Sequence, residues 1–430
     1  MRNKDFILKG HICYSENSET LTIMEDSYLV CVDGISKGVF REIPEAYRNL
    51  PMKDYSGHLV MPGLTDLHVH APQYAFRGLG MDWELLEWLN TQTFPEESKY
   101  GDEEYARKAY RIFAEDLKRS GTTRAAVFAT IHVPGTEILM EELELAGVTA
   151  YVGKVNMDRN SPEYLIEETK ASAEATRRWL SDLKEKEAAG NGFRHVKPIL
   201  TPRFIPSCTD ELMRLLAEIQ KEYHLPVQSH LSENFGEIAW VKELCPEAEF
   251  YGDAYDRFGL FGEEAPAIMA HCVHSGEREI QRMKERGVYV AHCPQSNTNL
   301  SSGIAPIRRY LNEGIHVGLG SDVAGGHSLS IFRAITDAIQ ESKLRWRLCD
   351  DSLKPLTVEE AFYLGTMGGG SFFGRAGSFL EGYEVDALVL DESRMRHPQE
   401  LTVRERLERF LYLCGDQDVL HKFAARESIF

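Results

Sequence analysis

The chain lacks the features that mark secreted, membrane-spanning or zinc-knuckle proteins. None of its eight cysteines forms a Cys-x-x-Cys pair, which argues against a structural zinc knuckle and favours reduced, buried thiols. No run of about 18 apolar residues occurs, so no membrane-spanning helix is predicted. The segment 1–14 has no long apolar stretch of the kind that a signal peptide requires. These absences together predict a cytoplasmic protein.

Positive charge is also scarce relative to negative charge. The chain has 48 Lys and Arg residues against 67 Asp and Glu residues, a formal net charge of −19. A field of this sign disfavours nucleic acid and anionic membrane surfaces, and no Lys-rich or Arg-rich stripe opposes it. It admits a small neutral ligand such as a free base. The charge therefore predicts no nucleic-acid partner and no membrane partner, and it leaves a small-molecule partner open.

After residue 60, strand-like and helix-like segments alternate along the chain. Strands separated by amphipathic helices predict a parallel sheet with right-handed crossovers. Eight repeats of this unit predict an α/β fold of the closed (β/α)8, TIM-like barrel type. The strand-like runs are 60–68, 122–130, 148–156, 196–203, 226–230, 266–272, 288–293 and 315–321. The helix-like segments lie near 102–120, 135–146, 162–187, 209–223, 235–244, 276–286 and 304–313.

Both ends of the chain carry further strand-like segments. Residues 1 to about 60 have the pattern of short strands with turns, and "GSFLEGYEVDALVLD" at 377–391 resumes it. The two sets are either separate additions or one domain, and one domain is favoured because isolated hairpins are marginally stable in water. We therefore predict a small β-sandwich domain from both termini, with segments 1–60 and 376–430 flanking a barrel of residues 61–375. The last segment also holds an amphipathic terminal helix, "VRERLERFLYLC".

Ionisable residues gather where the predicted barrel strands end. His68 and His70 stand one residue apart, and alternate residues of a strand point to the same face. Such a pair also occurs by accident, but His230, His271 and Asp322 stand at the ends of other predicted strands, where barrel enzymes place their chemistry. Three imidazoles and one carboxylate suit Zn²⁺ or Fe²⁺. The predicted metal ligands are His68, His70, His230 and Asp322.

Glu233 lies three residues after His230 and is the candidate for moving protons. A carboxylate at the start of a helix is also favourable with the helix dipole, and this structural role can coexist with catalysis. A metal ion lowers the pKa of its bound water from 15.7 towards about 7, and a nearby carboxylate can then shuttle the proton. This chemistry serves deaminases, amidases, phosphoesterases and dechlorinases alike.

Together these motifs resemble the mononuclear branch of the amidohydrolase superfamily and, more narrowly, the guanine deaminase family. Binuclear members carry a bridging lysine at the end of strand four, where this chain has "KPILTPRF", so the resemblance implies one metal ion per chain. Ser321 stands where a Thr is usual before the Asp. The blocks that carry the resemblance are "HAPQY" (70–74), "LLEWLNTQTFPEE" (85–97), "GTTRAAVFATIH" (121–132), "TPRF" (201–204), "SHLSEN" (229–234), "AHCPQSNTNLSSG" (291–303) and "GLGSDVAGG" (318–326).

The resemblance implies a function and a role for each site residue. The implied reaction is hydrolytic deamination of guanine to xanthine and ammonia by a metal-bound hydroxide, in purine catabolism or salvage, by a homodimer. Glu233 would take a proton from the water and deliver it to a ring nitrogen of the purine. His271 would orient the water, and Asp322 would share the proton transfer. The implied zinc ligands are His68, His70, His230 and Asp322.

Substrate contacts are expected at the same strand ends. Guanine presents O6 and N7 as acceptors, and Arg203 offers a fork of donors that could grip this edge. Phe204 could stack on the ring, and Gln73 could bind the neighbouring edge. The alternatives are a surface ion pair for Arg203 and a core position for Phe204. The predicted substrate-binding set is Gln73, Arg203, Phe204, His230, Glu233 and Asp322.

Two other functions stay open from the sequence. A sibling enzyme could deaminate or dechlorinate another nitrogen heterocycle, such as a pterin, an adenine derivative or a triazine. A non-catalytic barrel scaffold is the other alternative, but such chains characteristically lose metal ligands, and this chain keeps each expected one. His292, inside the apolar run "VYVAHCP", is interpreted as a structural residue.

Overall fold

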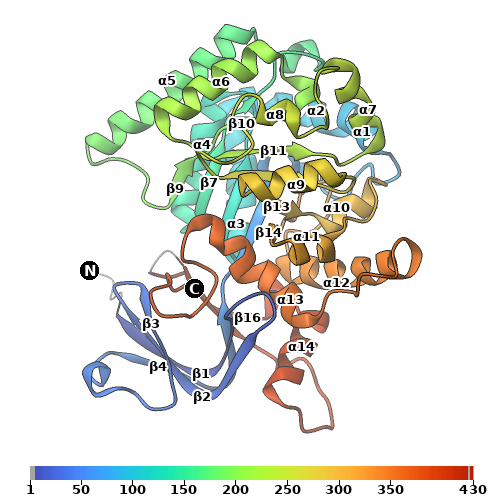
Figure 1. The fold of residues 1–430 in the computed structure, drawn as a ribbon. Coiled ribbons are helices and arrows are strands. Elements are labelled where there is room, and N and C mark those ends of the chain that lie inside the picture. Colours follow the sequence, from blue (N-terminus) through green and yellow to red (C-terminus); the bar gives the residue numbers. More distant parts are fainter. Residues whose placement is uncertain (1–4, 425–426, 430) are drawn as a thin grey trace.

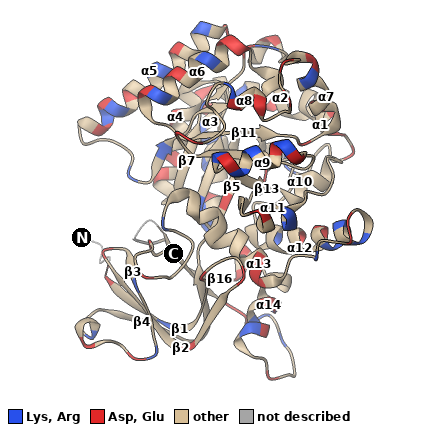
Figure 2. Cartoon of the chain, in the orientation of Figure 1, with Lys and Arg blue, Asp and Glu red and all other residues tan. Residues whose placement is uncertain are grey.

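The structure is a computed structural model that describes residues 5–424 and 427–429. Figure 1 shows two parts, a larger body of strands surrounded by helices and a smaller sheet to which both ends of the chain contribute. Helices and strands are combined in one α/β fold. In Figure 2, acidic and basic segments are interspersed on α5, α6 and α9 of the larger body. None of the described helices is long and apolar enough to cross a membrane.

Parallel strands form the centre of the larger body. They pair in chain order as two four-stranded sheets, β5-β6-β7-β9 and β11-β12-β13-β14. A parallel bridge between Leu200 and Val227 joins the two sheets on one side. On the other side, the N–H of Asp322 donates to the carbonyl of His68 at 2.8 Å, so the segment after β14 lies beside β5. The bounds are β5 Leu64–His70, β6 Thr122–Phe128, β7 Thr149–Gly153, β8 Val155–Asn156, β9 Val196–Pro198, β10 Thr201–Pro202, β11 Val227–Leu231, β12 Ala267–His271, β13 Tyr289–His292 and β14 His316–Leu319.

Helices alternate with these strands, as the sequence pattern predicts. Thr209 begins α6 by accepting from the N–H of Leu212 at 3.2 Å, and His224 ends it in a left-handed conformation. The predicted helix 162–187 is wrong at its start, because α5 begins only at Thr169. The pattern also does not predict α12. The bounds are α3 Glu103–Arg119, α4 Val133–Ala146, α5 Thr169–Ala188, α6 Asp210–Tyr223, α7 Phe235–Leu244, α9 Glu277–Arg286, α11 Ile307–Glu313, α12 Ile331–Leu348 and α13 Val358–Tyr363.

Strands from both chain ends pair in one seven-stranded sheet. Its order is β17-β16-β15-β4-β1-β2-β3. Phe6 and Phe423, from opposite ends of the chain, lie with ring centroids 5.4 Å apart in a core that also holds Leu8 and Phe379. The apolar side chains of the two ends therefore stabilise one another. The bounds are β1 Phe6–Ser15, β2 Leu21–Val32, β3 Ile35–Phe40, β4 Met52–Pro62, β15 Ala387–Leu390, β16 Val419–Ala424 and β17 Glu427–Ser428.

The predicted first barrel strand, 60–68, is wrong in its boundaries. Residues 60–62 belong to β4 of the end sheet, and β5 begins only after Gly63. A Cβ atom at Gly63 would lie 2.3 Å from Thr123 Oγ1, so only glycine allows this close approach to β6. One residue thus separates the end sheet from the parallel strands.

The predicted terminal helix is confirmed as α14, Val403–Leu413. Thr402 and Glu405 form a capping box at its start. Phe410 of α14 packs on Phe332 of α12 with ring centroids 5.4 Å apart, so the helix lies against the larger body. The remaining short helices are η1 Glu45–Tyr47, η2 Ala71–Phe76, α1 Leu85–Trp88, η3 Leu89–Thr93, α2 Phe94–Glu97, η4 Ser98–Gly101, η5 Glu163–Leu165, η6 Ile205–Ser207, α8 Asp253–Asp256, α10 Pro294–Asn299, η7 Leu364–Gly368, η8 Ser371–Phe373 and η9 Asp416–Asp418.

Candidate metal and substrate site

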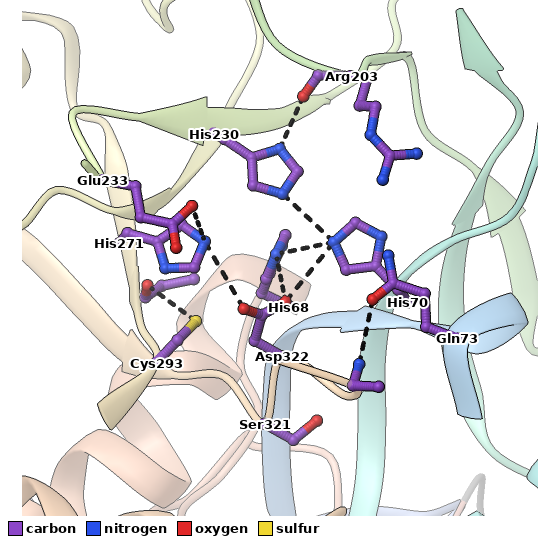
Figure 3. Close-up of polar contacts among 12 residues, drawn as sticks. His68, His70, Gln73, Arg203, His230, Glu233, His271, Cys293, Ser321 and Asp322 are labelled. Atoms are coloured by element: carbon purple, nitrogen blue, oxygen red, sulfur yellow. Dashed lines mark hydrogen bonds and ion pairs between the residues drawn. The ribbon is translucent and has the colours of Figure 1, made fainter. Parts of the chain in front are cut away.

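His68 and His70 reach one location from the end of β5. Every residue of β5 is buried. His70 Nε2 lies 3.2 Å from His68 Nε2 and 3.2 Å from Nε2 of His230 in β11. Figure 3 shows these rings turned toward one point. Burial lowers the pKa of all three imidazoles and so favours the neutral form, which is the form that ligates metal ions.

Asp322 joins this group from the segment after β14. Its Oδ1 lies 3.1 Å from His68 Nε2 and 3.6 Å from His70 Nε2. Burial alone would raise the pKa of the Asp322 carboxyl, but the neighbouring His68 and His271 outweigh burial and hold this pKa well below its usual range. The carboxylate is therefore ionised at the point where the imidazoles converge.

The spacing of these side chains fits a metal ion. Ligand nitrogens at about 2.0–2.1 Å from a tetrahedral ion lie roughly 3.3 Å from one another, close to the 3.2 Å seen between the ring nitrogens. His230 Nδ1 donates to the carbonyl of Arg203 at 2.7 Å, which leaves its Nε2 with a free lone pair. Another grouping within ligand distance is His271, Cys293 and Asp322. Burial raises the pKa of Cys293 well above its ordinary value, which disfavours the thiolate that this grouping would need.

Glu233, two residues after β11, and His271, the last residue of β12, lie close to each other. Glu233 Oε2 lies 3.4 Å from His271 Nε2, and Asp322 Oδ2 lies 3.7 Å from the same nitrogen. Burial raises the pKa of Glu233 to about 7. Burial alone would lower the pKa of His271, but Glu233 and Asp322 outweigh it and raise this pKa. Near neutral pH, the two side chains can therefore share a proton.

Nearly all of the predicted site residues line one pocket. All of them line it except His68, whose side chain is fully buried. Phe204 is nearly buried, and its ring meets the ring of Trp240 edge-on at 6.5 Å. The rest of the wall is mainly apolar and suits a flat, largely apolar ligand. The other lining residues are Leu85, Trp88, Leu89, Glu237 and Leu300.

Arg203 binds a buried carboxylate. Its Nη1 lies 2.5 Å from Glu97 Oε2 and its Nη2 lies 3.1 Å from Glu97 Oε1, with the side chains 3% and 1% exposed. Gln73 Nε2 donates to Glu97 Oε1 at 3.0 Å, and Gln73 Oε1 accepts from the N–H of Ala324 at 3.1 Å. The alternative of a surface ion pair for Arg203 is therefore wrong, because the ion pair lies inside the protein.

Comparison with known proteins relates this site to a family. The Amidohydrolase family model matches residues 59–420. Guanine deaminase of Dictyostelium discoideum is 40% identical over 373 residues, which cover 85% of this chain and 81% of that protein. A solved structure of guanine deaminase from C. acetobutylicum, with guanine bound in its active site, is 47% identical with a TM-score of 0.95, and the match covers 99% of this chain and 100% of that one. This chain belongs to the guanine deaminase family of amidohydrolases.

The guanine deaminase of Escherichia coli shows the same relationship. Its sequence is 34% identical over 392 residues, which cover 89% of this chain and 84% of that protein. Its solved structure matches with a TM-score of 0.86 and covers 99% of each chain. The resemblance inferred from the sequence blocks is thus confirmed. Amidohydrolases are metal-dependent, and the cluster of His68, His70 and Asp322 offers this guanine deaminase relative a candidate metal site.

Several polar residues that hold the candidate site are not predicted by the sequence. Ser302 Oγ donates to Glu233 Oε1 at 3.0 Å, and His271 Nδ1 donates to Asn297 Oδ1 at 3.0 Å. Both residues belong to the block "AHCPQSNTNLSSG", but nothing in their type or spacing separates them from their neighbours. Glu97 likewise ends the block "LLEWLNTQTFPEE" without a signal of its own.

His292 lies outside the site. It ends β13 but is not among the described residues that line the pocket. Its Nε2 lies 3.8 Å from Glu341 Oε2, and burial lowers the pKa of His292 to about 3. A neutral, buried imidazole at this position agrees with the structural role inferred from the apolar run around it.

Proposed function

We propose that this chain catalyses the hydrolytic deamination of guanine to xanthine and ammonia. Guanine deaminases match it over most of its length, and one solved relative holds guanine in its active site. The observation that carries the proposal is the buried acid Glu233, which shares one pocket with the histidine and aspartate cluster and with Gln73 and Arg203. Replacing an amino group by water needs an activated water and a group that moves protons.

We propose that one Zn²⁺ ion is held by the three imidazoles and the carboxylate. Fe²⁺ takes the same ligand types and is the alternative. When bound, the metal ion activates the water that attacks the purine. The neutral histidines and the ionised Asp322 support this assignment, because ligands must be deprotonated. The proposed ligands are His68, His70, His230 and Asp322.

Glu233 is proposed to carry the protons. Water adds to the carbon that bears the amino group, the C–N bond breaks, and ammonia leaves with the proton that the water lost. Glu233 lines the pocket beside the proposed metal ligands, so its carboxylate can accept this proton and deliver it to a ring nitrogen or to the departing amine. His271 Nε2, close to both Glu233 and Asp322, is proposed to orient the water. Asp322 shares the proton transfer.

Gln73, Arg203 and Phe204 are proposed to bind the base. Arg203 and Gln73 carry N–H donors that suit the acceptor edge of guanine. Phe204 offers an aromatic face or edge to the purine ring. The other proposed substrate contacts are His230, Glu233 and Asp322, which line the same pocket.

We also propose the finer architecture. The bridge between Leu200 and Val227, together with the hydrogen bond from Asp322 to His68, supports closure of eight parallel strands into a (β/α)8 barrel. The end sheet is proposed to curl around its core as a β-sandwich. The predicted domain limits are 1–60, 61–375 and 376–430, and the first of them falls two residues before the end of β4. The homodimer and the cytoplasmic location stay predictions from the sequence.

A substrate panel tests the proposed function. Metal-loaded protein is given guanine, adenine, a pterin and an aminated triazine, and ammonia release is measured for each. We expect kcat/KM for guanine to exceed that of every other compound by at least about a hundredfold, because a site that pairs buried polar groups rejects ligands that leave them unpaired. If another compound released ammonia faster than guanine, that compound would be the better substrate and the proposal of guanine would be wrong.

A further inference from the structure

We propose that Glu97 is a positioning residue that determines which purines the pocket accepts, an inference that rests on the proposed deamination of guanine. Glu97 is the last residue of α2, and its side chain is 1% exposed. It is not among the described residues that line the pocket, whereas Arg203 and Gln73 are. Any effect of Glu97 on a ligand therefore acts through these two side chains.

Both carboxylate oxygens of Glu97 are engaged. Oε2 accepts from Arg203 Nη1 at 2.5 Å, and Oε1 accepts from Arg203 Nη2 at 3.1 Å and from Gln73 Nε2 at 3.0 Å. Two parallel bonds of this kind fix the plane of the guanidinium group. Of its five N–H donors, two point at Glu97, so the others are held in a defined direction for further partners.

Glu97 also determines the orientation of the Gln73 amide. Gln73 Oε1 accepts from the N–H of Ala324 at 3.1 Å while Nε2 donates to Glu97. Turning the amide by half a turn would place its oxygen against a carboxylate and its NH₂ against an N–H, and both contacts would be repulsive. The observed orientation leaves Gln73 with an N–H donor. Arg203 and Gln73 together therefore favour a ligand edge made of acceptors, such as an oxo group beside a ring nitrogen.

The Glu97 charge cancels the Arg203 charge inside the protein. A buried cation without a counter-ion attracts anions strongly, because the surroundings screen it poorly. The ion pair has side chains that are 3% and 1% exposed, so the pocket presents oriented donors without a net charge from this pair. Such a pocket suits a neutral oxopurine such as guanine. It does not favour an anionic oxopurine such as urate, although urate has similar acceptors.

Glu97→Gln separates these effects because it keeps the side-chain shape and removes the charge. We expect KM for guanine to rise about tenfold or more, because charge-assisted hydrogen bonds are lost and the Gln73 amide is released, with a smaller change in kcat. The inhibition constant of urate, a monoanion at neutral pH, should fall. Glu96→Gln is the matched control: this neighbouring buried acid binds Lys99 and Tyr105 and should leave both constants as in the wild type.

A packing defect would raise both constants, so opposite shifts identify the charge effect. Glu97→Asp, shorter but still charged, should raise KM for guanine and leave urate inhibition weak. If melting curves show that Glu97→Gln does not fold, Glu97→Asp replaces it as the test variant. An unchanged KM for guanine in Glu97→Asp would then overturn the inference. If the wild type deaminates guanine, equal values of KM for guanine and of the urate inhibition constant in Glu97→Gln and Glu96→Gln would overturn this inference and leave the proposed function standing. A metal-loaded wild type that releases no ammonia from guanine would instead overturn the proposed function.

Discussion

Arg124 of β6 joins the parallel strands to the segment that precedes β15. Its Nε donates to Asp386 Oδ2 at 2.7 Å, and its Nη2 donates to Glu384 Oε2 at 2.7 Å. The side chains of Arg124 and Asp386 are each 3% exposed, whereas Glu384 is 41% exposed. The bond to Asp386 is therefore the buried part of this network, and it connects the two parts of the fold.

Arg124→Met removes the charge of Arg124 and keeps an apolar stem in its place. The Asp386 carboxylate would lose its guanidinium neighbour inside the protein, and breaking one side of a buried ion pair costs about 3–5 kcal/mol. The exposed Glu384 adds at most about 1 kcal/mol, because water screens it. We therefore expect the free energy of unfolding to fall by about 3–5 kcal/mol. Arg124→Met combined with Asp386→Leu should recover part of this loss, because the Asp386 carboxylate is no longer buried without its guanidinium neighbour, while the buried Lys422 keeps Asp416 as its other acidic neighbour.

Urea unfolding followed by tryptophan fluorescence measures these changes. The control is Arg278→Met, since Arg278 and its partner Glu249 are 73% and 63% exposed and their ion pair should contribute less than about 1 kcal/mol. If Arg124→Met cost no more than this control, the buried pair would not hold the two parts together. A double variant that is less stable than the single one would contradict the argument from buried charge.

Three further predictions concern pH, packing and the metal. Burial raises the pKa of Glu341 from 4.5 to about 8 in the folded protein. The protonated side chain therefore contributes stability that is fully present below the pKa of the unfolded chain and is lost as pH rises through the pKa of the folded protein. Glu341→Gln should therefore melt higher than the wild type near pH 9 but not near pH 5, and equal melting curves at both would refute this sign. Gly63→Ala should lower the melting temperature by several degrees, because its Cβ would lie 2.3 Å from Thr123 Oγ1; an unchanged melting temperature would show that β6 yields easily. A chelator should abolish guanine turnover and lower the melting temperature, and Zn²⁺ should restore both; full activity at a metal content near zero would exclude the proposed site.

The metal-ligand candidates could be predicted from the sequence because barrel enzymes place their functional residues at the C-terminal ends of the strands. Apolar runs at regular intervals locate the parallel strands, and polar residues directly after them fall at one edge of the body. His68 and His70 follow from the alternation of side chains along a strand, and the structure brings their Nε2 atoms to 3.2 Å. His230 and Asp322 could be added because each stands at the end of another such run.

The residues that orient the site could not be predicted, because their partners are distant in sequence. Glu97 binds Arg203 across 106 positions, and Ser302 binds Glu233 across 69. An acid in a short helix or a serine in a loop has the same local pattern whether it is buried or exposed. The boundary at Gly63 depends on the approach of Thr123 from β6, which also appears only in three dimensions.

Guanine turnover by the wild type and by Glu233→Gln, at matched metal content, tests the central claim most directly. Absorbance follows the loss of guanine, and ammonia is assayed in the same tube. We predict that the wild type converts guanine to xanthine with one ammonia per base, and that Glu233→Gln is slower by at least about a hundredfold, because proton transfer by a placed side chain contributes this much. A wild type that leaves guanine unchanged, or a Glu233→Gln variant as fast as the wild type, would contradict the account.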